Sequence, residues 1–459
     1  MPALRAVQVS SKVQRAFRPL REEEVSTTGA RGGERPERRI GLATATGLVV
    51  ASMIGTGVFT TTGLLVADIP SAPGILCCWA VSGVAALCGA LAYAELGAAF
   101  GESGGEYHFL SRLFHPGLGF MSAWSSLIVG FSAPLAAVAL AFGNYLAVFV
   151  PGLAPQWSGA ALIVVLSVVN IWRVSAGAGF QNLFTLGKVL LILGFIVIGL
   201  MWGDPGRLVA TAERPLGATI ASPGFAIGLL WVAFAYTGWN ASAYVAGEVK
   251  DPGRVLPRAL VMGTALVTVL YVGLNAVFLA AAPLSDLAGK VEVAHVAATH
   301  LLGAGGARVS SGVIALGLVS TVGALIVTGP RVYEAVGRDH RSLRFLARRS
   351  ARGGPVVAIA LQSTLALVMM ATARFETLLI YIGFTLSIFA GLTVCSVFAL
   401  RRRADIAAPY RMWGYPVTPC LFVALMVWMV LQGIIERPAT ALAGLATMVT
   451  GLLVYRISR

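Results

Sequence analysis

The sequence has few charged residues and little hydrophilic chain. Of its 459 residues, 12% are charged and 57% are hydrophobic, whereas soluble globular domains carry about 25% charged residues. Such a composition cannot supply the polar surface of a water-soluble fold of this length, which excludes that class. Only residues 1–40 form a long polar stretch, so no folded domain is expected outside a membrane.

Acidic residues and cysteines are also few. The chain has 20 Asp and Glu against 34 Lys and Arg, and its five cysteines lie in or beside apolar runs without metal-ligand spacing. We therefore expect small buried apolar cysteines and no metal site. No nucleophile can be placed beside a base, and no glycine-rich stretch has the ending of a phosphate-binding loop. The sequence thus predicts neither an enzyme nor a cofactor.

Apolar runs of about 20 residues, the length of a membrane-spanning helix, recur along the chain. Because the bilayer core offers no water to unpaired backbone groups, these runs must be helices. We predict an all-α integral membrane protein with twelve spans. Their expected limits are 41–66, 74–99, 118–146, 157–172, 181–202, 223–247, 258–282, 308–333, 355–373, 376–400, 416–435 and 438–456.

The distribution of Lys and Arg predicts the orientation. An even number of spans places both termini on one side, and that side carries 27 Lys and Arg against 6 on the other. The positive-inside rule makes the first side cytoplasmic, in a cell membrane. The net charge of +14 then reflects orientation and contact with anionic lipid, not nucleic-acid binding. Residues 1–40 become a flexible, basic cytoplasmic tail, or alternatively a short amphipathic helix on the membrane.

The first and sixth predicted spans each carry glycine and small polar residues near their middle. The interruptions are Ile54–Gly57 and Tyr236–Asn240. Glycine costs about 1 kcal/mol in a helix interior relative to alanine, and it allows the backbone to unwind and approach a ligand. Two breaks at matching depth, five spans apart, indicate a transporter built from inverted repeats. Close helix packing at small residues is the alternative.

The two breaks expose different backbone groups. Unwinding at Gly55–Gly57 leaves N–H groups at a half-helix N-terminus, which suits a carboxylate. Unwinding at Phe234–Thr237 leaves carbonyl oxygens at a half-helix C-terminus, which suit an ammonium group. The breaks together fit a zwitterionic amino acid. No acidic residue or arginine stands at mid-depth in the spans expected to form the site, which favours a neutral substrate of small to medium size.

Four motifs along the chain are typical of one transporter superfamily. They are Ile54–Phe59, Tyr93–Gly97 with Ser103–Tyr107, Phe234–Asn240 with Glu248–Pro257, and Pro409–Arg411 with Tyr415–Pro416. They resemble the amino acid–polyamine–organocation superfamily over about residues 40 to 455, and the third resembles its L-type amino acid transporter branch.

The resemblance implies alternating-access amino acid transport by a LeuT-type 5+5 inverted repeat. The transporter core would be residues 41–400, with repeats at about 41–202 and 223–400 and discontinuous helices 1 and 6. Residues 401–459 would supply spans 11 and 12.

The resemblance also assigns the substrate site. The implied substrate-binding residues are Ser52, Met53, Ile54, Gly55, Thr56, Gly57, Phe234, Ala235, Tyr236, Thr237, Gly238 and Asn240. Phe234 would be an aromatic lid, and Asn240 would steady the unwound turn. Glu95 and Trp239 would be gate or structural residues. The L-type branch tends to have glycine where Thr237 stands, so the pocket is expected to be too small for a large aromatic substrate.

Lys188 lies early in the fifth predicted span, and an ionisable residue inside the membrane is a functional hypothesis by default. The resemblance places it where related sodium-coupled carriers bind sodium. If the Lys188 ammonium group stays charged, it makes a sodium ion at that place unnecessary. If it titrates, it carries the coupled proton instead. A structural lysine that binds first-helix carbonyls or extends to the interface is the alternative.

The sequence therefore predicts a sodium-independent secondary transporter of neutral amino acids, working by proton symport or amino acid exchange. A non-transporting amino acid receptor and an exchanger of cationic amino acids or polyamines are alternatives. The L-type resemblance raises a heteromeric carrier with a single-pass partner. Because the loop at 147–156 has no cysteine for such a partner, no partner subunit is expected.

Overall fold

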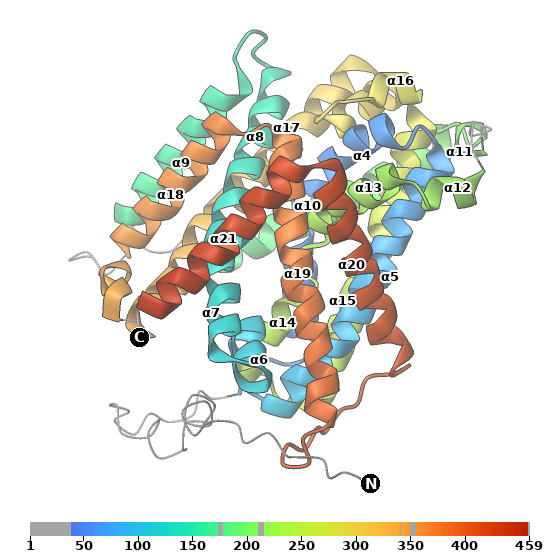
Figure 1. The fold of residues 1–459 in the computed structure, drawn as a ribbon. Helices are drawn as coiled ribbons and strands as arrows, with labels where there is room; N and C mark the ends of the chain where they lie inside the picture. The colour runs from blue at the N-terminus through green and yellow to red at the C-terminus, as the bar shows by residue number, and fades with distance from the viewer. Residues whose placement is uncertain (1–37, 173–177, 210–214, 340, 349–354, 458–459) are drawn as a thin grey trace, which may run out of the picture. The chain divides into compact units, whose positions relative to one another are not determined.

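The computed structural model describes residues 38–459, apart from 173–177, 210–214, 340, 349–354 and 458–459. The chain divides into two units, Met1–Arg38 and Arg39–Arg459, and everything below concerns the second (Figure 1). The tail predicted at residues 1–40 lies almost wholly outside the described residues.

The described chain is helical, and its only extended pairing is a bridge between Ile40 and Val249. Its α-helices are α3 (Leu42–Met53), α4 (Gly57–Asp68), α5 (Ala72–Phe100), α6 (Gly105–Leu113), α7 (Pro116–Ser125), α8 (Ala133–Ala147), α9 (Pro155–Trp172), α10 (Ala178–Trp202), α11 (Gly206–Val209), α12 (Leu216–Ile220), α13 (Pro223–Tyr236), α14 (Ala241–Tyr244), α15 (Pro252–Ala281), α16 (Leu284–Leu287), α17 (Val293–Asp339), α18 (Val356–Thr372), α19 (Phe375–Arg401), α20 (Val417–Glu436) and α21 (Pro438–Ile457). A π-helix, η1 (Ser126–Ser132), and two 3-10 helices, η2 (Ala246–Glu248) and η3 (Arg341–Ala347), complete the set.

Nine helices of the described chain are long and apolar enough to cross a bilayer, and the bent pair of α3 and α4 makes a tenth. Two shorter apolar helices, α13 and α18, lie where the sixth and ninth spans are expected. Helices at the periphery expose large apolar side chains, such as Leu200 (80% exposed) on α10 and Ile435 (66%) on α20. The all-helical, multi-pass membrane architecture is thereby confirmed.

The two interruptions predicted from the sequence are present as breaks. Helix α3 ends at Met53, α4 begins at Gly57, and their axes differ by 43°. Helix α13 ends at Tyr236, and the chain passes through Gly238 with a φ of 100° before α14 begins. Glycine adopts that conformation without the steric cost that other residues meet.

Helix α15 runs beside α3 and α5, as Figure 1 shows for α15 and α5, and carries a buried polar cluster. Asn275 is fully buried and hydrogen-bonds the Thr62 hydroxyl of α4. The same hydroxyl accepts a hydrogen bond of 3.2 Å from the Trp79 indole N–H of α5. Since buried polar groups are costly unless paired, this cluster fixes the register of the three helices.

The third predicted span, 118–146, is not a uniform α-helix. Its middle is the π-helix η1, and two side-chain hydroxyls donate to the Leu127 carbonyl there. The Ser132 hydroxyl donates to that carbonyl at 3.1 Å, and the Tyr333 hydroxyl of α17 donates to it as well. The wider turn is therefore tied to α17, a long-range contact that hydrophobic periodicity does not reveal.

Candidate substrate site

The two helix breaks lie against each other. A Cβ added to Gly57 would stand 2.5 Å from the Ala235 Cα, and one added to Gly238 would stand 2.6 Å from the Ser52 carbonyl oxygen. Real side chains do not fit at such distances. The two backbones therefore approach closely only because both positions are glycine. The fold thus brings together residues that are far apart in the sequence and were predicted to share one site.

The first break presents an unpaired hydroxyl beside a helix N-terminus. Thr56 is 1% exposed, and within the described chain its Oγ1 has no hydrogen-bond partner. Thr56 directly precedes α4, whose first N–H groups lack acceptors within the helix. The first turn of α4 contains no acidic side chain that would neutralise those groups. This arrangement suits a bound carboxylate.

Tyr271 of α15 hydrogen-bonds both breaks. Its hydroxyl lies 2.5 Å from the Met53 carbonyl oxygen and 3.2 Å from the Ala235 carbonyl oxygen. These are the last turns of α3 and α13, where carbonyls lose their helical partners. Sequence reasoning missed Tyr271. The available signal was the pair Tyr271 and Asn275, one helical turn apart, which continues the spacing of Thr264 and Thr268 along one face of a mostly apolar run.

The sixth break is partly capped by its own residues. The Thr237 hydroxyl donates to the Phe234 carbonyl at 2.7 Å, and the Thr237 N–H donates to it at 3.1 Å. Since Tyr271 holds the Ala235 carbonyl, two carbonyls expected to be free for an ammonium group are already hydrogen-bonded. The Tyr236 hydroxyl donates to the Trp79 carbonyl at 3.0 Å, so its side chain points toward α5.

The residues that follow Gly238 face another part of the protein. The Trp239 ring packs edge-on against Tyr93 of α5, with ring centroids 4.7 Å apart. The Asn240 side-chain amide lies 3.5 Å from a carboxylate oxygen of Glu106. Both positions therefore connect the break to α5 and α6.

Lys188 of α10 ties the first break to α17. Its Nζ donates to the Ile54 carbonyl at 3.2 Å and to the Thr321 hydroxyl at 2.8 Å. The aliphatic stem passes over Gly317, where an added Cβ would lie 3.5 Å from the lysine Cε. This is the contact with a first-helix carbonyl that a fixed ammonium would make. Sequence reasoning did not identify Thr321 as its second partner.

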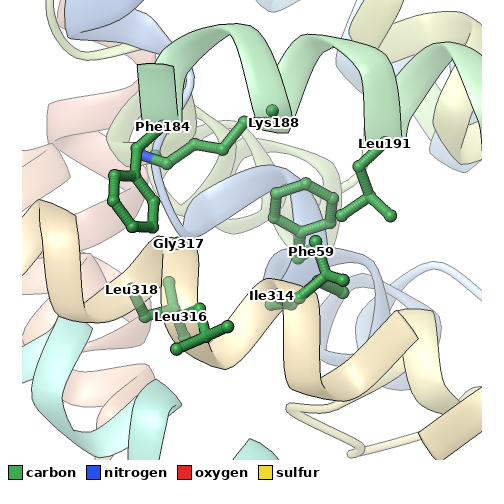
Figure 2. A pocket seen from close by; sticks show the side chains of 11 residues that line it. Phe59, Phe184, Lys188, Leu191, Ile314, Leu316, Gly317 and Leu318 are labelled. Carbon is green, nitrogen blue, oxygen red and sulfur yellow. The ribbon is translucent and has the colours of Figure 1, made fainter. Parts of the chain in front are cut away.

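A cavity of about 280 Å³ lies beside Lys188, between α4, α10 and α17. Figure 2 shows Phe184 and the lysine amino group at one end of it, and Phe59 and Leu191 at the other. Gly55 of the first break also lines this cavity. Apart from the ammonium group its wall is mostly apolar, so the cavity offers few groups to orient a zwitterion.

Glu95 lies apart from the breaks, in a buried ion pair. It is fully buried, and its two carboxylate oxygens accept hydrogen bonds of 2.8 Å from Arg401 Nε and Nη2. The Met412 backbone N–H donates to the same carboxylate at 2.8 Å. The Tyr415 ring stacks 3.8 Å from the Arg401 guanidinium carbon. These contacts fasten the segment before α20 to α5 and favour the structural reading of Glu95.

The fold is that of a multi-pass membrane protein in which two interrupted helices lie against each other. The chain belongs to the amino acid permease family, whose profile matches residues 40–454. It is therefore an amino acid transporter and not an enzyme.

Three relatives place it within that family. The mouse "Large neutral amino acids transporter small subunit 2" is 30% identical over 95% of this chain and 83% of its own length. The mouse "b(0,+)-type amino acid transporter 1" is 30% identical over 92% of this chain and 88% of its own length. The "Serine/threonine exchanger SteT" of Bacillus subtilis is 32% identical over 84% of this chain and 89% of its own length. Because the first relative is named a small subunit, these relatives do not support the expectation that no partner subunit is needed.

Proposed function

We propose that this chain exchanges small neutral amino acids across a cell membrane without sodium. The observation that carries the proposal is the direct contact of the two breaks, with the unpaired Thr56 hydroxyl and the α4 N-terminus beside it. One relative is named a serine/threonine exchanger, which supports small neutral substrates and exchange. Another is named a transporter of large neutral amino acids, which supports neutral substrates but not the small size. Proton symport is the alternative mode of transport.

The proposed architecture has twelve spans in a LeuT-type 5+5 arrangement. Helices α13 and α18 would complete the ten spans found by length and composition. The core would be residues 41–400, with repeats at 41–202 and 223–400, followed by two spans in 401–459. The asymmetry of Lys and Arg supports cytoplasmic termini.

In the proposed site the substrate carboxylate binds at the first break, where the Thr56 hydroxyl and the N–H groups around Gly57 face it. Phe234 covers the substrate, and Thr237 narrows the space at the sixth break. The ammonium group meets carbonyl oxygens there, in competition with the hydrogen bonds that Thr237 and Tyr271 already make. The remaining members of the predicted set position these groups.

Lys188 is proposed to be a fixed cation. Its two hydrogen bonds, to the Ile54 carbonyl and the Thr321 hydroxyl, occupy the space between α4, α10 and α17. A permanently placed ammonium group organises the first break in every state, which removes the need for a sodium ion. Transport would then be driven by a counter-substrate.

The test is radiolabelled uptake into liposomes that contain only this purified chain. Serine, leucine, arginine and glutamate are supplied in turn, against internal amino acid, a proton gradient or a sodium gradient. We expect uptake of serine only against internal amino acid, and flux without any other subunit. Sodium-driven uptake would refute the fixed-cation role, and proton-driven uptake without internal substrate would replace exchange by symport.

Lys188→Met sharpens the test, with Lys290→Met as a control because Lys290 is exposed. We expect at least a tenfold loss of exchange in the first, since a buried carbonyl and hydroxyl lose a charged donor. The control should retain wild-type flux. Equal flux in the two variants would remove Lys188 from the transport mechanism.

A further inference from the structure

Glu106, at the start of α6, is a buried carboxyl that the proposed substrate site does not use. It is 6% exposed. Its Oε1 accepts from the Tyr93 hydroxyl at 2.5 Å and from the Asn240 amide at 3.5 Å, and its Oε2 accepts from the Ser122 hydroxyl at 3.2 Å. Within the described chain no Lys, Arg or His forms an ion pair with it. These partners come from α5, α7 and the sixth break.

All three partners donate, which is the pattern of an ionised carboxylate. Burial of such a group without a cation is costly. Burial raises the pKa of Glu106, while the hydrogen bonds from Tyr93 and Ser122 lower it. The other titratable group that faces it is Tyr244 of α14, and α19 contributes Thr393 near Tyr93. Burial and these hydrogen bonds thus act in opposite directions on the protonation of this carboxyl.

The same region fastens the second half of the sixth helix to the loop before α6. The Gly104 N–H donates to the Tyr244 carbonyl at 3.1 Å, and the Gly247 N–H donates to the Ser103 hydroxyl at 3.2 Å. On its other side α14 is tied to α3, because the Ser242 hydroxyl donates to the Ala45 carbonyl at 2.7 Å. A change at Glu106 therefore acts on α14, which follows the sixth break and is hydrogen-bonded to α3, the helix that ends at the first break.

We infer that Glu106 is a proton-binding site that controls how firmly Asn240 and α14 are held to the loop before α6. Hydrogen bonds to a charged acceptor are about twice as strong as neutral ones. The carboxylate therefore holds Asn240 firmly, and the protonated acid holds it weakly. Opening of this side of the carrier then becomes easier as pH falls. The inference depends on the chain being a transporter, and not on which amino acid it carries.

The first test is the rate of amino acid exchange in liposomes buffered equally on both faces, from pH 5 to pH 8. We expect the wild-type rate to rise several-fold toward pH 5. Glu106→Gln, a permanently neutral side chain of the same shape, should vary less than twofold over this range and stay near the acidic rate. Glu248→Gln, the same change at an exposed position, is the control and should keep the wild-type profile. A wild-type profile in Glu106→Gln would overturn the inference.

A second variant separates proton binding from a structural role. Ser122→Ala removes one donor that favours the carboxylate, so the midpoint of the profile should move up by about half a pH unit to one unit. A merely structural role for Glu106 would lower the rate at every pH and leave the midpoint unchanged. This outcome would refute the inference even if Glu106→Gln failed to fold.

A third measurement does not depend on transport. Hydrogen exchange by mass spectrometry reports the peptides that cover residues 101–106 and 241–248, corrected for the intrinsic effect of pH. We expect weaker protection at pH 5 than at pH 8 in the wild type, and weak protection at both in Glu106→Gln. Equal protection at the two pH values in the wild type would contradict the inference. If no amino acid exchange were found but hydrogen-exchange protection still depended on pH, the proposed exchange would be refuted and the inference about Glu106 would be supported.

Discussion

The two helix breaks are held in different ways. At the first, side chains from distant helices bind the unwound carbonyls: Lys188 binds Ile54, and Tyr271 binds Met53. At the sixth, the Thr237 hydroxyl of the break itself caps the Phe234 carbonyl. Within the described chain, Tyr271 hydrogen-bonds carbonyls of both breaks. The first break also has a local backbone hydrogen bond, since the Gly55 N–H donates to the Met53 carbonyl at 2.7 Å. The side chains that hold the first break thus come from the surrounding helices, whereas the side-chain cap of the sixth comes from its own sequence.

This difference predicts that the first break keeps one conformation and that the sixth break can change its conformation. Lys188 and Thr321 anchor the first break to α10 and α17. The sixth break continues into Asn240, whose side chain contacts the Glu106 carboxyl and the Tyr244 hydroxyl. We expect the first break to tolerate little change, and the sixth to accept substitutions that alter substrate choice.

The largest effect is expected where the two breaks touch. In Gly57→Ala the new Cβ would stand 2.5 Å from the Ala235 Cα, which is backbone and cannot move aside as a side chain can. The breaks must separate, so exchange should fall to background. Gly47→Ala in α3 is the matched control, because no atom lies within 4 Å of its added Cβ. Uptake into liposomes measures the exchange activity of the two variants, and thermal unfolding in detergent shows whether they fold.

Retained exchange in Gly57→Ala would mean that the breaks are not in contact during transport. If Gly57→Ala did not fold, Gly238→Ala would test the contact between the breaks instead. The φ of 100° at Gly238 and the nearby Ser52 carbonyl predict the same loss of exchange. Wild-type flux in either variant would refute the claim that transport requires close contact between the two breaks.

The sequence was sufficient to predict the positions of both breaks, because the residues that cause them are local. Gly57 and Gly238 mark where backbones meet, and helix interiors otherwise disfavour glycine. The same holds for most of the spans, since an apolar run of bilayer length is a local property. The proposed pairing of repeats remains a prediction.

Contacts between distant helices could not be predicted in this way. Tyr271 of α15 and Glu106 of α6 hydrogen-bond residues of the breaks, and Thr321 of α17 binds Lys188, which holds the first break. No pattern within one helix specifies those partners. The π-helix in the third span was not predicted for the same reason, since Tyr333 of the distant helix α17 donates to its Leu127 carbonyl. The expectation of free carbonyls at the sixth break failed locally, because it did not consider that the Thr237 side chain could turn back onto Phe234.

An intermediate effect is expected for Tyr271→Phe, which tests the one contact that both breaks share. Removal of the hydroxyl takes the buried side-chain donor from both carbonyls, and only Met53 retains a second donor, the Gly55 N–H. An unsatisfied buried acceptor costs about 1–3 kcal/mol. Exchange should fall by about tenfold or more, with the ring still in place. Tyr381→Phe is a suitable control, since that hydroxyl pairs with Thr447 away from the breaks. Equal losses in the two variants would show that Tyr271 has no special role.

The smallest effect, and the most specific, is expected at Thr237. Thr237→Gly removes the side chain that is proposed to narrow the substrate site, so the ratio of leucine to serine exchange should rise, by less than about tenfold. Thr237→Val keeps the volume and removes only the cap on the Phe234 carbonyl, so its ratio should stay near that of the wild type while total exchange falls. Competition uptake with both labelled amino acids measures the ratio directly. If both variants shifted the ratio equally, the hydroxyl and not the volume would select the substrate, and the sixth break would then be as dependent on its hydrogen bonds as the first.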